Sequence, residues 1–158
     1  MELPEALVEA LRRRGLDIDY VIDALVVSLN IDPSDAAKAH AELALAMFGE
    51  GLGFVDRGDV VQSSEKLYRA VEEGVKALAI AKGLDEAREA LSKGRWTVSL
   101  LDKAARKLGD AVWRAWSEAY FLHVNGFHEV RIDIDDVKAR LPIIQGLIDE
   151  VRKSLGIT

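Results

Sequence analysis

A chain of 158 residues, of which 49% are hydrophobic and 30% charged, has the size and composition of one globular domain rather than of a disordered protein. Its net charge of -6 argues against a surface that neutralises many nucleic-acid phosphates, because such surfaces are rich in Lys and Arg. The absence of cysteine excludes disulfides, thiolate catalysis and Cys-ligated zinc.

Apolar residues recur with the period of an amphipathic helix through most of the chain, and the first two predicted helices are short. The first begins at Pro4, which suits a first helical turn, and ends at Gly15. Asp17 or Asp19 caps the second helix, which ends at Asn30. The apolar stripe of this second helix comprises Ile18, Ile22, Leu25 and Leu29.

The next two predicted helices are longer. Asp32, followed by a proline, begins a helix that ends at the turn of residues 56–59. Asp59 and Gln62 have the spacing of a capping box and begin the following helix, which ends at Gly83. The inward faces of the two helices comprise Ala41, Leu45, Phe48, Leu52 and Val55, and Val60, Leu67, Val71, Val75 and Leu78, respectively.

Three further helical segments are predicted in the second half of the chain. A short helix covers residues 85–94, and helical spacing continues over residues 97–122 with a break or bend at Gly109. Asp133 begins the last helix, and Pro142 should kink it because proline removes one backbone donor.

Four long amphipathic elements with short connections favour an all-α, up-and-down helical bundle. We expect one domain overall, in which residues 1–31 are an N-terminal helical appendage and residues 32–158 form the bundle. The N-terminus has acids and a proline where a signal peptide has cations and an apolar run. No apolar stretch approaches the ~20 residues of a membrane span. We therefore expect a cytoplasmic protein with no membrane partner.

Aromatic rings and titratable groups are concentrated between Trp113 and Glu129. Such a concentration can line a binding pocket. Alternatively, Trp113, Trp116 and Phe127 are core or dimer-interface residues, since their rings bury a large area. The second interpretation is the one we favour for the aromatic residues.

His123 and His128 invite a metal-site interpretation. A spacing of five residues, however, places two side chains about 140° apart around an α-helix, and Gly126 is expected to end the helix between them. Glu129 is the one nearby candidate for a third ligand. We expect instead that the histidines satisfy backbone groups around the turn at Asn125, and we predict no metal and no cofactor.

Four acids and the remaining histidine lie on predicted helices. Glu72 and Glu73 are expected to face solvent, whereas Glu65 and Glu118 lie nearer the apolar stripes and would face a polar layer in the bundle. His40 is expected to be structural. The sequence contains no phosphate-binding loop, nucleophile elbow or kinase signature, so we predict no catalytic residues.

Several segments together resemble a known archaeal family. They are HAELALAMF from His40, QSSEKLYRAVEEGVKALA from Gln62, GRWTV from Gly94 and LHVNGFHE from Leu122. Over nearly its whole length the chain is similar to the first group of the archaeal PaREP-type family, which is itself similar to the HEPN class of helical bundles. The resemblance implies a HEPN-like antiparallel four-helix bundle with extra N-terminal helices, a homodimer and an archaeal cytoplasm. The scarcity of Asn, Gln and Met among many charged residues is also typical of thermophiles.

The resemblance implies no reaction. Active HEPN ribonucleases carry an Arg that is followed four to six residues later by a His, and a dimer brings these groups together. In this chain Arg114 and His123 are separated by eight residues, and Arg131 follows His128 rather than preceding it. The motif is therefore absent, and the nuclease chemistry of the HEPN class does not carry over.

The leading hypothesis is a non-catalytic, dimeric binding or interaction module that holds a nucleotide or a protein partner. The acidic balance favours a protein partner over a nucleic acid. The candidate binding residues are Arg95, Trp96, Trp116, His123, Asn125, His128 and Glu129.

Two alternatives remain. The first is a divergent, metal-independent ribonuclease in which His123 or His128 is the general acid or base and Arg114 or Arg95 stabilises the phosphorane. The second is an antitoxin-like partner of a nucleotidyltransferase, a role that other HEPN bundles have.

Overall fold

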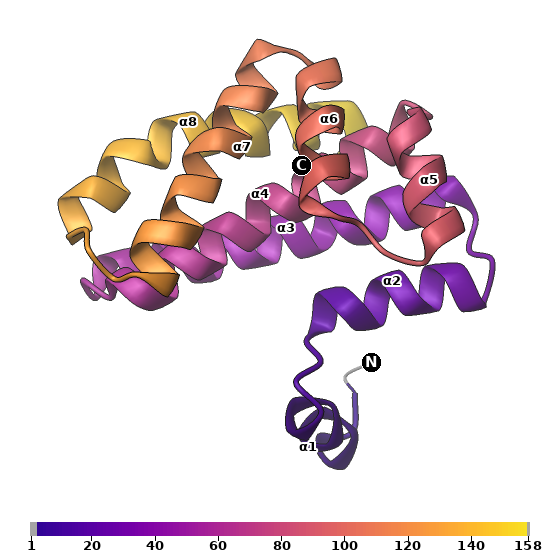
Figure 1. Cartoon of the computed structure of the whole chain (residues 1–158), viewed down its shortest axis with the longest axis horizontal. Helices are drawn as coiled ribbons and strands as arrows, with labels where there is room; N and C mark the ends of the chain where they lie inside the picture. Colours follow the sequence, from indigo (N-terminus) through magenta and orange to yellow (C-terminus); the bar gives the residue numbers. More distant parts are fainter. Residues whose placement is uncertain (1–2, 158) are drawn as a thin grey trace.

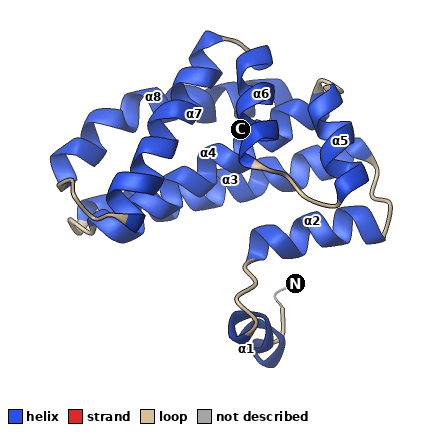
Figure 2. Ribbon diagram, in the orientation of Figure 1, coloured by secondary structure: helices blue, strands red, loops and turns tan. Residues whose placement is uncertain are grey.

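The computed structural model describes residues 3–157, and within this range the secondary structure consists of eight α-helices and one π-helical segment, with no strand. Short loops join the helices (Figure 2). In chain order the elements are α1 (Glu5–Arg13), α2 (Ile18–Ser28), α3 (Pro33–Asp56), α4 (Val60–Ala81), α5 (Asp85–Lys93), α6 (Val98–Leu108), α7 (Asp110–Leu122), η1 (His123–His128) and α8 (Ile134–Leu155). The predicted all-α fold class is confirmed.

Capping residues begin the helices where the sequence predicts them. Asp17, rather than Asp19, caps α2 by accepting a hydrogen bond from a backbone N–H of the first turn. Asp32 and Asp59 do the same for α3 and α4. Gly109, with a φ of 123°, separates α6 from α7, as predicted. Local sequence therefore accounts for most helix boundaries.

The long helices α3, α4, α7 and α8 form a bundle in which α4 contacts each of the other three (Figure 1). Leu67, Val71 and Val75 on the inward face of α4 are fully buried, as predicted. Gly74 lets α8 approach α4 closely, since a Cβ at this position would lie 3.2 Å from Val151. The helices α5 and α6 pack on each other and on α4, and α6 also packs on α7.

The last helix is continuous through the proline in its interior. A capping box at Asp133 and Asp136 begins α8, which extends past Pro142 to Leu155. Within residues 3–157 no helix combines the length and the apolar character that crossing a bilayer requires.

The first two helices differ from the rest. In Figure 1, α1 projects away from the bundle, and α2 runs along its edge beside α3. Of the predicted apolar stripe of α2, Leu25 and Leu29 are 48% and 65% exposed, and only Ile22 is half-buried. The side chain of Ile18 lies outside the described part of the chain. The predicted apolar face of α2 is therefore largely exposed to solvent.

Candidate functional site

A π-helical segment, η1, continues α7 and carries two of the three histidines. The backbone N–H of Glu129 donates to the carbonyl of Val124, five residues earlier, in a hydrogen bond of 2.8 Å that is typical of a π-helix. The expectation that Gly126 ends the helix is wrong, since this glycine is buried inside η1. A Cβ at Gly126 would lie 2.0 Å from Oγ of Ser64, so close packing of η1 on α4 requires glycine here.

The π-helix brings His123 and His128 together. Their Nε2 atoms are 3.1 Å apart. The prediction of about 140° between the two side chains is wrong because it assumed α-helical periodicity, whereas π-helical bonding places residues five apart on one face. The two histidines were also expected to bond to backbone groups. In the structure their ring nitrogens contact side chains instead, namely Glu65 and each other.

His123 is held on several sides. Its Nδ1 lies 3.0 Å from Oε2 of Glu65 on α4, and its ring stacks on that of Tyr68 at a centroid distance of 4.1 Å. Glu65 is buried and also accepts a hydrogen bond of 2.9 Å from Nε of Arg69. Glu65 thus faces a polar layer of the bundle, as the sequence predicted.

The same face of α4 is joined to α2 by ion pairs. Arg69 contacts Asp17 at 2.6 Å and Asp19 at 3.2 Å. About two turns further along α4, Nζ of Lys76 lies 3.1 Å from Asp23. The chain positions of these partners differ by about fifty residues, so helical periodicity alone does not predict them.

Lys76 also lies among acids of its own helix. Its Nζ is 2.9 Å from Glu73 and 3.4 Å from Glu72, and the side chain of Glu73 is 0% exposed. The prediction that Glu73 faces solvent is wrong, because α2 and α3 cover this face of α4. His40 on α3 contacts Glu73 through Nδ1, and its Nε2 lies 3.5 Å from Asp23.

Burial and neighbouring charges shift several pKa values in this network. Burial, reinforced by the negative charge of Glu73, raises the pKa of Asp19 to about 7. Burial would also raise the pKa of Glu73, but the hydrogen bond with His40 and the charge of Lys76 lower it instead. The acids around Lys76 raise its pKa despite its burial. Burial, followed by the charge of Glu72, raises the pKa of Tyr68.

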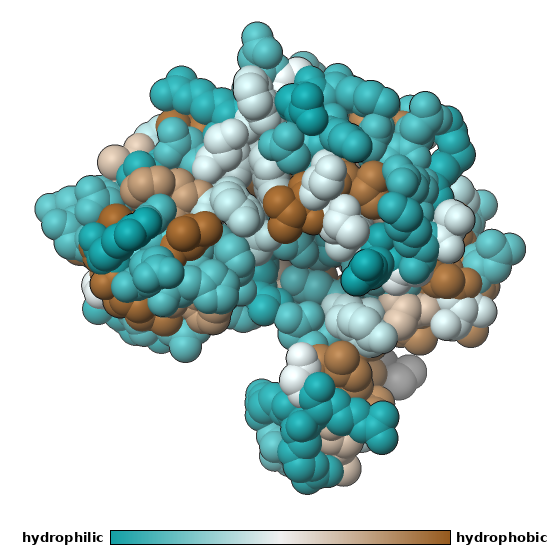
Figure 3. All heavy atoms as spheres, in the orientation of Figure 1, coloured by the Kyte–Doolittle hydropathy of each residue, from teal (hydrophilic) through white to brown (hydrophobic). Residues whose placement is uncertain are grey.

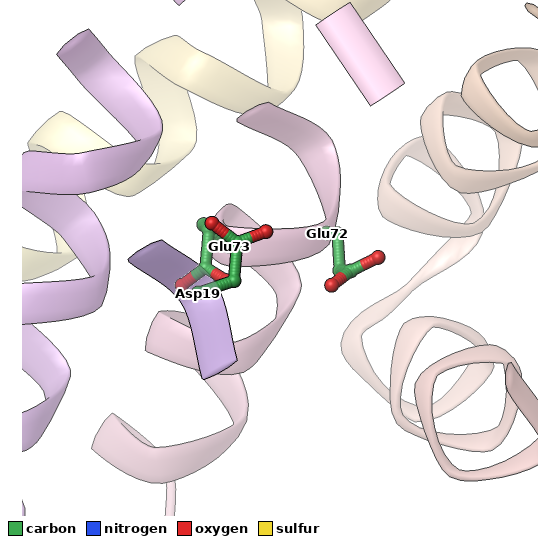
Figure 4. Close-up of side chains that lie close together, drawn as sticks. All are labelled: Asp19, Glu72 and Glu73. Atoms are coloured by element: carbon green, nitrogen blue, oxygen red, sulfur yellow. The ribbon is translucent and has the colours of Figure 1, made fainter. Parts of the chain in front are cut away.

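One cluster has the donor atoms of a metal site. Carboxylate oxygens of Asp19, Glu72 and Glu73 lie within 4.8 Å of one another (Figure 4). Nζ of Lys76 contacts two of these carboxylates, so an ammonium group already balances the negative charge that would attract a metal ion. The arrangement is that of a charged network that connects α2 to the bundle.

A polar cavity of about 480 Å³ lies between α2 and α4. It is lined by five acids, three cations and several rings, namely Asp17, Asp19, Asp23, Glu65, Glu72, Arg69, Lys76, Arg95, Tyr20, Tyr68, Trp96 and His123. A second, mostly apolar cavity of about 250 Å³ lies among α2, α3 and α5. Asp23, Arg95 and Trp96 line both cavities.

The structure brings some of the predicted site residues together and separates others. Arg95 and Trp96 line both cavities and His123 lines the polar one, whereas Trp116 is 2% exposed in the core and lines neither of the two. The core interpretation therefore holds for Trp116. Trp113, by contrast, is 43% exposed.

The remaining predicted residues lie in and after η1. The side chain of Asn125 stabilises this segment, because it donates to the carbonyl of Phe121 and accepts a hydrogen bond from Nε of Arg131. His128 and Glu129 are exposed at its C-terminal end.

Sequence reasoning missed Arg69 and Lys76. A signal was present, since acids and bases alternate at three- and four-residue spacing along one face of α4. Such a row usually lies in solvent, and only the position of α2 shows that here it is covered.

The sequence profile of the archaeal PaREP1/PaREP8 family matches residues 39–148, which is more than half of the chain. The protein belongs to this family. The predicted membership of the archaeal PaREP family is thus confirmed. In this PaREP1/PaREP8-family protein, α4 and η1 lie inside the matched region, whereas α1 and α2 precede it.

Two solved structures resemble the chain. A crystal structure of a Sulfolobus solfataricus protein has a TM-score of 0.67 and 33% sequence identity, and the match covers 72% of this chain and 96% of that one. A solution structure of the same target has a TM-score of 0.63 and 34% identity, with coverage of 71% and 90%. No curated protein matches the sequence.

Proposed function

We propose that this protein is a non-catalytic, dimeric binding module with a HEPN-like bundle, and that its α1–α2 side is the interaction surface. One observation carries the proposal. Large apolar side chains of α2 and of the residue that follows it face solvent instead of the bundle, including Tyr20 at 55%, Leu25 at 48% and the C-cap residue Leu29 at 65% exposure. Figure 3 shows hydrophobic surface along α2 and at its junction with α1. Exposed apolar surface of this kind marks interaction sites.

The first helix supports dimerisation. All nine residues of α1 are described, and none of them is buried. An isolated helix of this length is marginal in water, so a stable α1 needs a surface to pack against. Leu7 on α1 is 45% exposed, which leaves apolar surface for that contact. A second copy of the chain would cover α1 and α2 together.

The charges of the polar cavity favour a protein partner over a nucleotide. Five carboxylates and three cations line the cavity, and two of these cations, Arg69 and Lys76, are already paired with acids. A phosphate group needs cations that are free to bind it. A basic segment of a partner protein complements the surplus of carboxylates.

Native mass spectrometry of the full chain over a concentration series tests the proposal, because it reads the oligomer mass and any retained ligand together. We expect a dimer, and we expect Leu29→Glu to weaken dimerisation at least tenfold because a charge would be buried at the interface.

Ala111→Glu is the matched control. Ala111 is exposed on α7, near the α6–α7 turn, which lies on the opposite side of the molecule from α2 in Figure 1. This variant adds the same charge and should dimerise like the wild type. A wild-type protein that stays monomeric and carries no ligand at the highest concentration would contradict the proposal.

A specific observation favours one second candidate, the metal-independent ribonuclease. Glu65, His123 and His128 form a continuous row in which a carboxylate orients one imidazole against another. Such rows serve general acid–base catalysis. The cation that contacts this row, Arg69, is bound to three carboxylates and is poorly placed to stabilise a phosphorane.

Incubation with total RNA distinguishes the two candidates. The binding proposal expects no cleavage above that of a His123→Ala/His128→Ala double variant. Cleavage by the wild type that both single variants abolish would replace the proposal with the ribonuclease.

A further inference from the structure

The two histidines of η1 have the separation of two ligands on one metal ion. Their Nε2 atoms are 3.1 Å apart. Imidazole nitrogens lie ~2.0–2.1 Å from a bound Zn²⁺, so two of them at a tetrahedral angle are about 3.3 Å apart. His128 is exposed, so its ring can adjust by this small difference. Binding of an ion would replace the present contact between the two rings.

The tautomer of His123 is the one that a metal ligand requires. Nδ1 of His123 lies 3.0 Å from Oε2 of Glu65, and an ionised carboxylate only accepts hydrogen bonds. In the neutral imidazole the hydrogen therefore resides on Nδ1, and the lone pair of Nε2 faces His128. A carboxylate behind a ligating histidine is the recurrent arrangement of metal sites, since it orients the ring and raises its basicity.

Contacts with the rest of the chain support the π-helical backbone of η1. It is the one π-helical segment within residues 3–157, and π-helices are rare and concentrate at functional sites. Gly126 packs against Ser64, and the side chain of Asn125 bonds on both sides of the segment. In an α-helical continuation the two imidazoles would point in different directions.

We propose that His123 and His128 bind a divalent transition-metal ion such as Zn²⁺ through their Nε2 atoms, with Glu65 as the positioning residue behind His123. Within the described residues no third His or acid completes a three-ligand cluster with this pair. The site therefore keeps open positions for water or for a group of a bound partner. His123 also lines the polar cavity, so the ion lies at its edge.

The acidic cluster of Asp19, Glu72 and Glu73 does not compete for this ion. Lys76 supplies the positive charge there, and carboxylates suit Mg²⁺ or Ca²⁺ better than Zn²⁺. The acidic cluster and the histidine pair therefore differ in their ligand atoms, and a substitution in the acidic cluster should leave Zn²⁺ binding by the histidines unchanged.

Titration of the full chain with Zn²⁺ against a colorimetric chelator tests the proposal, together with the visible spectrum after titration with Co²⁺. We expect one ion per chain and Co²⁺ bands of a site with nitrogen ligands. His128→Ala should lower the affinity at least tenfold, and Glu65→Gln should lower it by ~10–100-fold, the usual effect of losing such a positioning carboxylate.

Two further measurements make the outcome decisive. Glu89→Gln removes one charge from the exposed face of α5, away from η1, and should bind Zn²⁺ like the wild type. Far-ultraviolet circular dichroism checks that His128→Ala is folded, which its exposure favours. A wild type that binds no ion, or an affinity that survives His128→Ala in folded protein, would overturn the proposal whatever the oligomeric state.

Discussion

The four-helix bundle and the α1–α2 pair use the same kind of amphipathic sequence in opposite ways. In α4 the apolar face is in the core, where Leu67 and Val71 are fully buried. In α2 the apolar face is exposed, with Leu25 at 48%, and the face toward the bundle carries acids such as Asp19 and Asp23. The bundle is held by apolar packing, whereas α2 is attached largely by ion pairs.

This difference shows what an apolar stripe tells about a helix. An apolar stripe identifies the face of a helix that becomes buried. It does not say whether the surface that buries it belongs to the same chain or to another chain. The ion pairs between α2 and α4 add little net stability, because desolvation offsets the attraction of the partly buried pairs and solvent screens the exposed pair of Arg69 and Asp17. They do specify where α2 lies, since no other face of α4 offers Arg69 and Lys76 together.

The largest expected contrast comes from truncating a leucine in each region. Leu67→Ala should destabilise the protein by about 2–5 kcal/mol, because it removes fully buried methyl groups and leaves a cavity. Leu29→Ala should change the free energy of unfolding of the monomer by only about 0.5 kcal/mol. Urea denaturation at low protein concentration measures both. Equal effects would mean that α2 packs into the core of the monomer.

A smaller effect is expected at the contact between η1 and α4. Gly126→Ala places a Cβ against Ser64 and should cost about 1–3 kcal/mol through overpacking. It should also separate the two imidazoles, which the ring resonances of His123 and His128 in NMR spectra would report. Ser64→Gly removes the colliding atoms and should recover part of the lost stability.

Gly146→Ala is the matched control for this substitution. A Cβ at Gly146, in the interior of α8, would meet no atom within 4 Å among the described residues. Alanine should stabilise the helix here by about 0.5–1 kcal/mol. A Gly126→Ala variant that is as stable as Gly146→Ala would show that the packing of η1 is looser than the structure indicates.

An effect that accumulates gradually with pH is expected at the ion pairs that attach α2. The pKa of Asp19 is raised to about 7 from 3.8, so between these values the folded protein holds a proton that the unfolded chain releases. Stability due to this group is therefore present at acidic pH and is lost as the pH rises toward 7, by up to about 1.4 kcal/mol per pH unit. Asp19→Asn should gain stability relative to the wild type over this range.

Urea denaturation at several pH values from about 5 to about 8 measures this difference, with Asp17→Asn as the control. The guanidinium of Arg69 holds the pKa of Asp17 below its usual value despite partial burial. Asp17 is therefore ionised over this whole range, and the effect of its substitution should not vary with pH. A constant difference between Asp19→Asn and the wild type would contradict the raised pKa.

The sequence by itself determined the α-helices, most of their boundaries and the family. Asp17, Asp59 and Gly109 act on backbone groups within a few residues of themselves, so their effect is readable without any knowledge of the fold. The inward face of α4 was equally readable, because a fully apolar stripe in a long helix has to be covered. The sequence also predicted Arg95, Trp96 and His123 as candidate binding residues, and each lines a cavity.

Only the tertiary structure decided which polar residues are buried and which histidines meet. Glu73 looks like a solvent-facing acid until α2 and α3 cover it. With α-helical periodicity, the side chains of His123 and His128 would point in different directions. The π-helical backbone of η1, in which Gly126 packs on Ser64, places them on the same face. In both cases the deciding contacts join residues far apart in the chain, and their free energy depends on shape and solvation that no local pattern encodes.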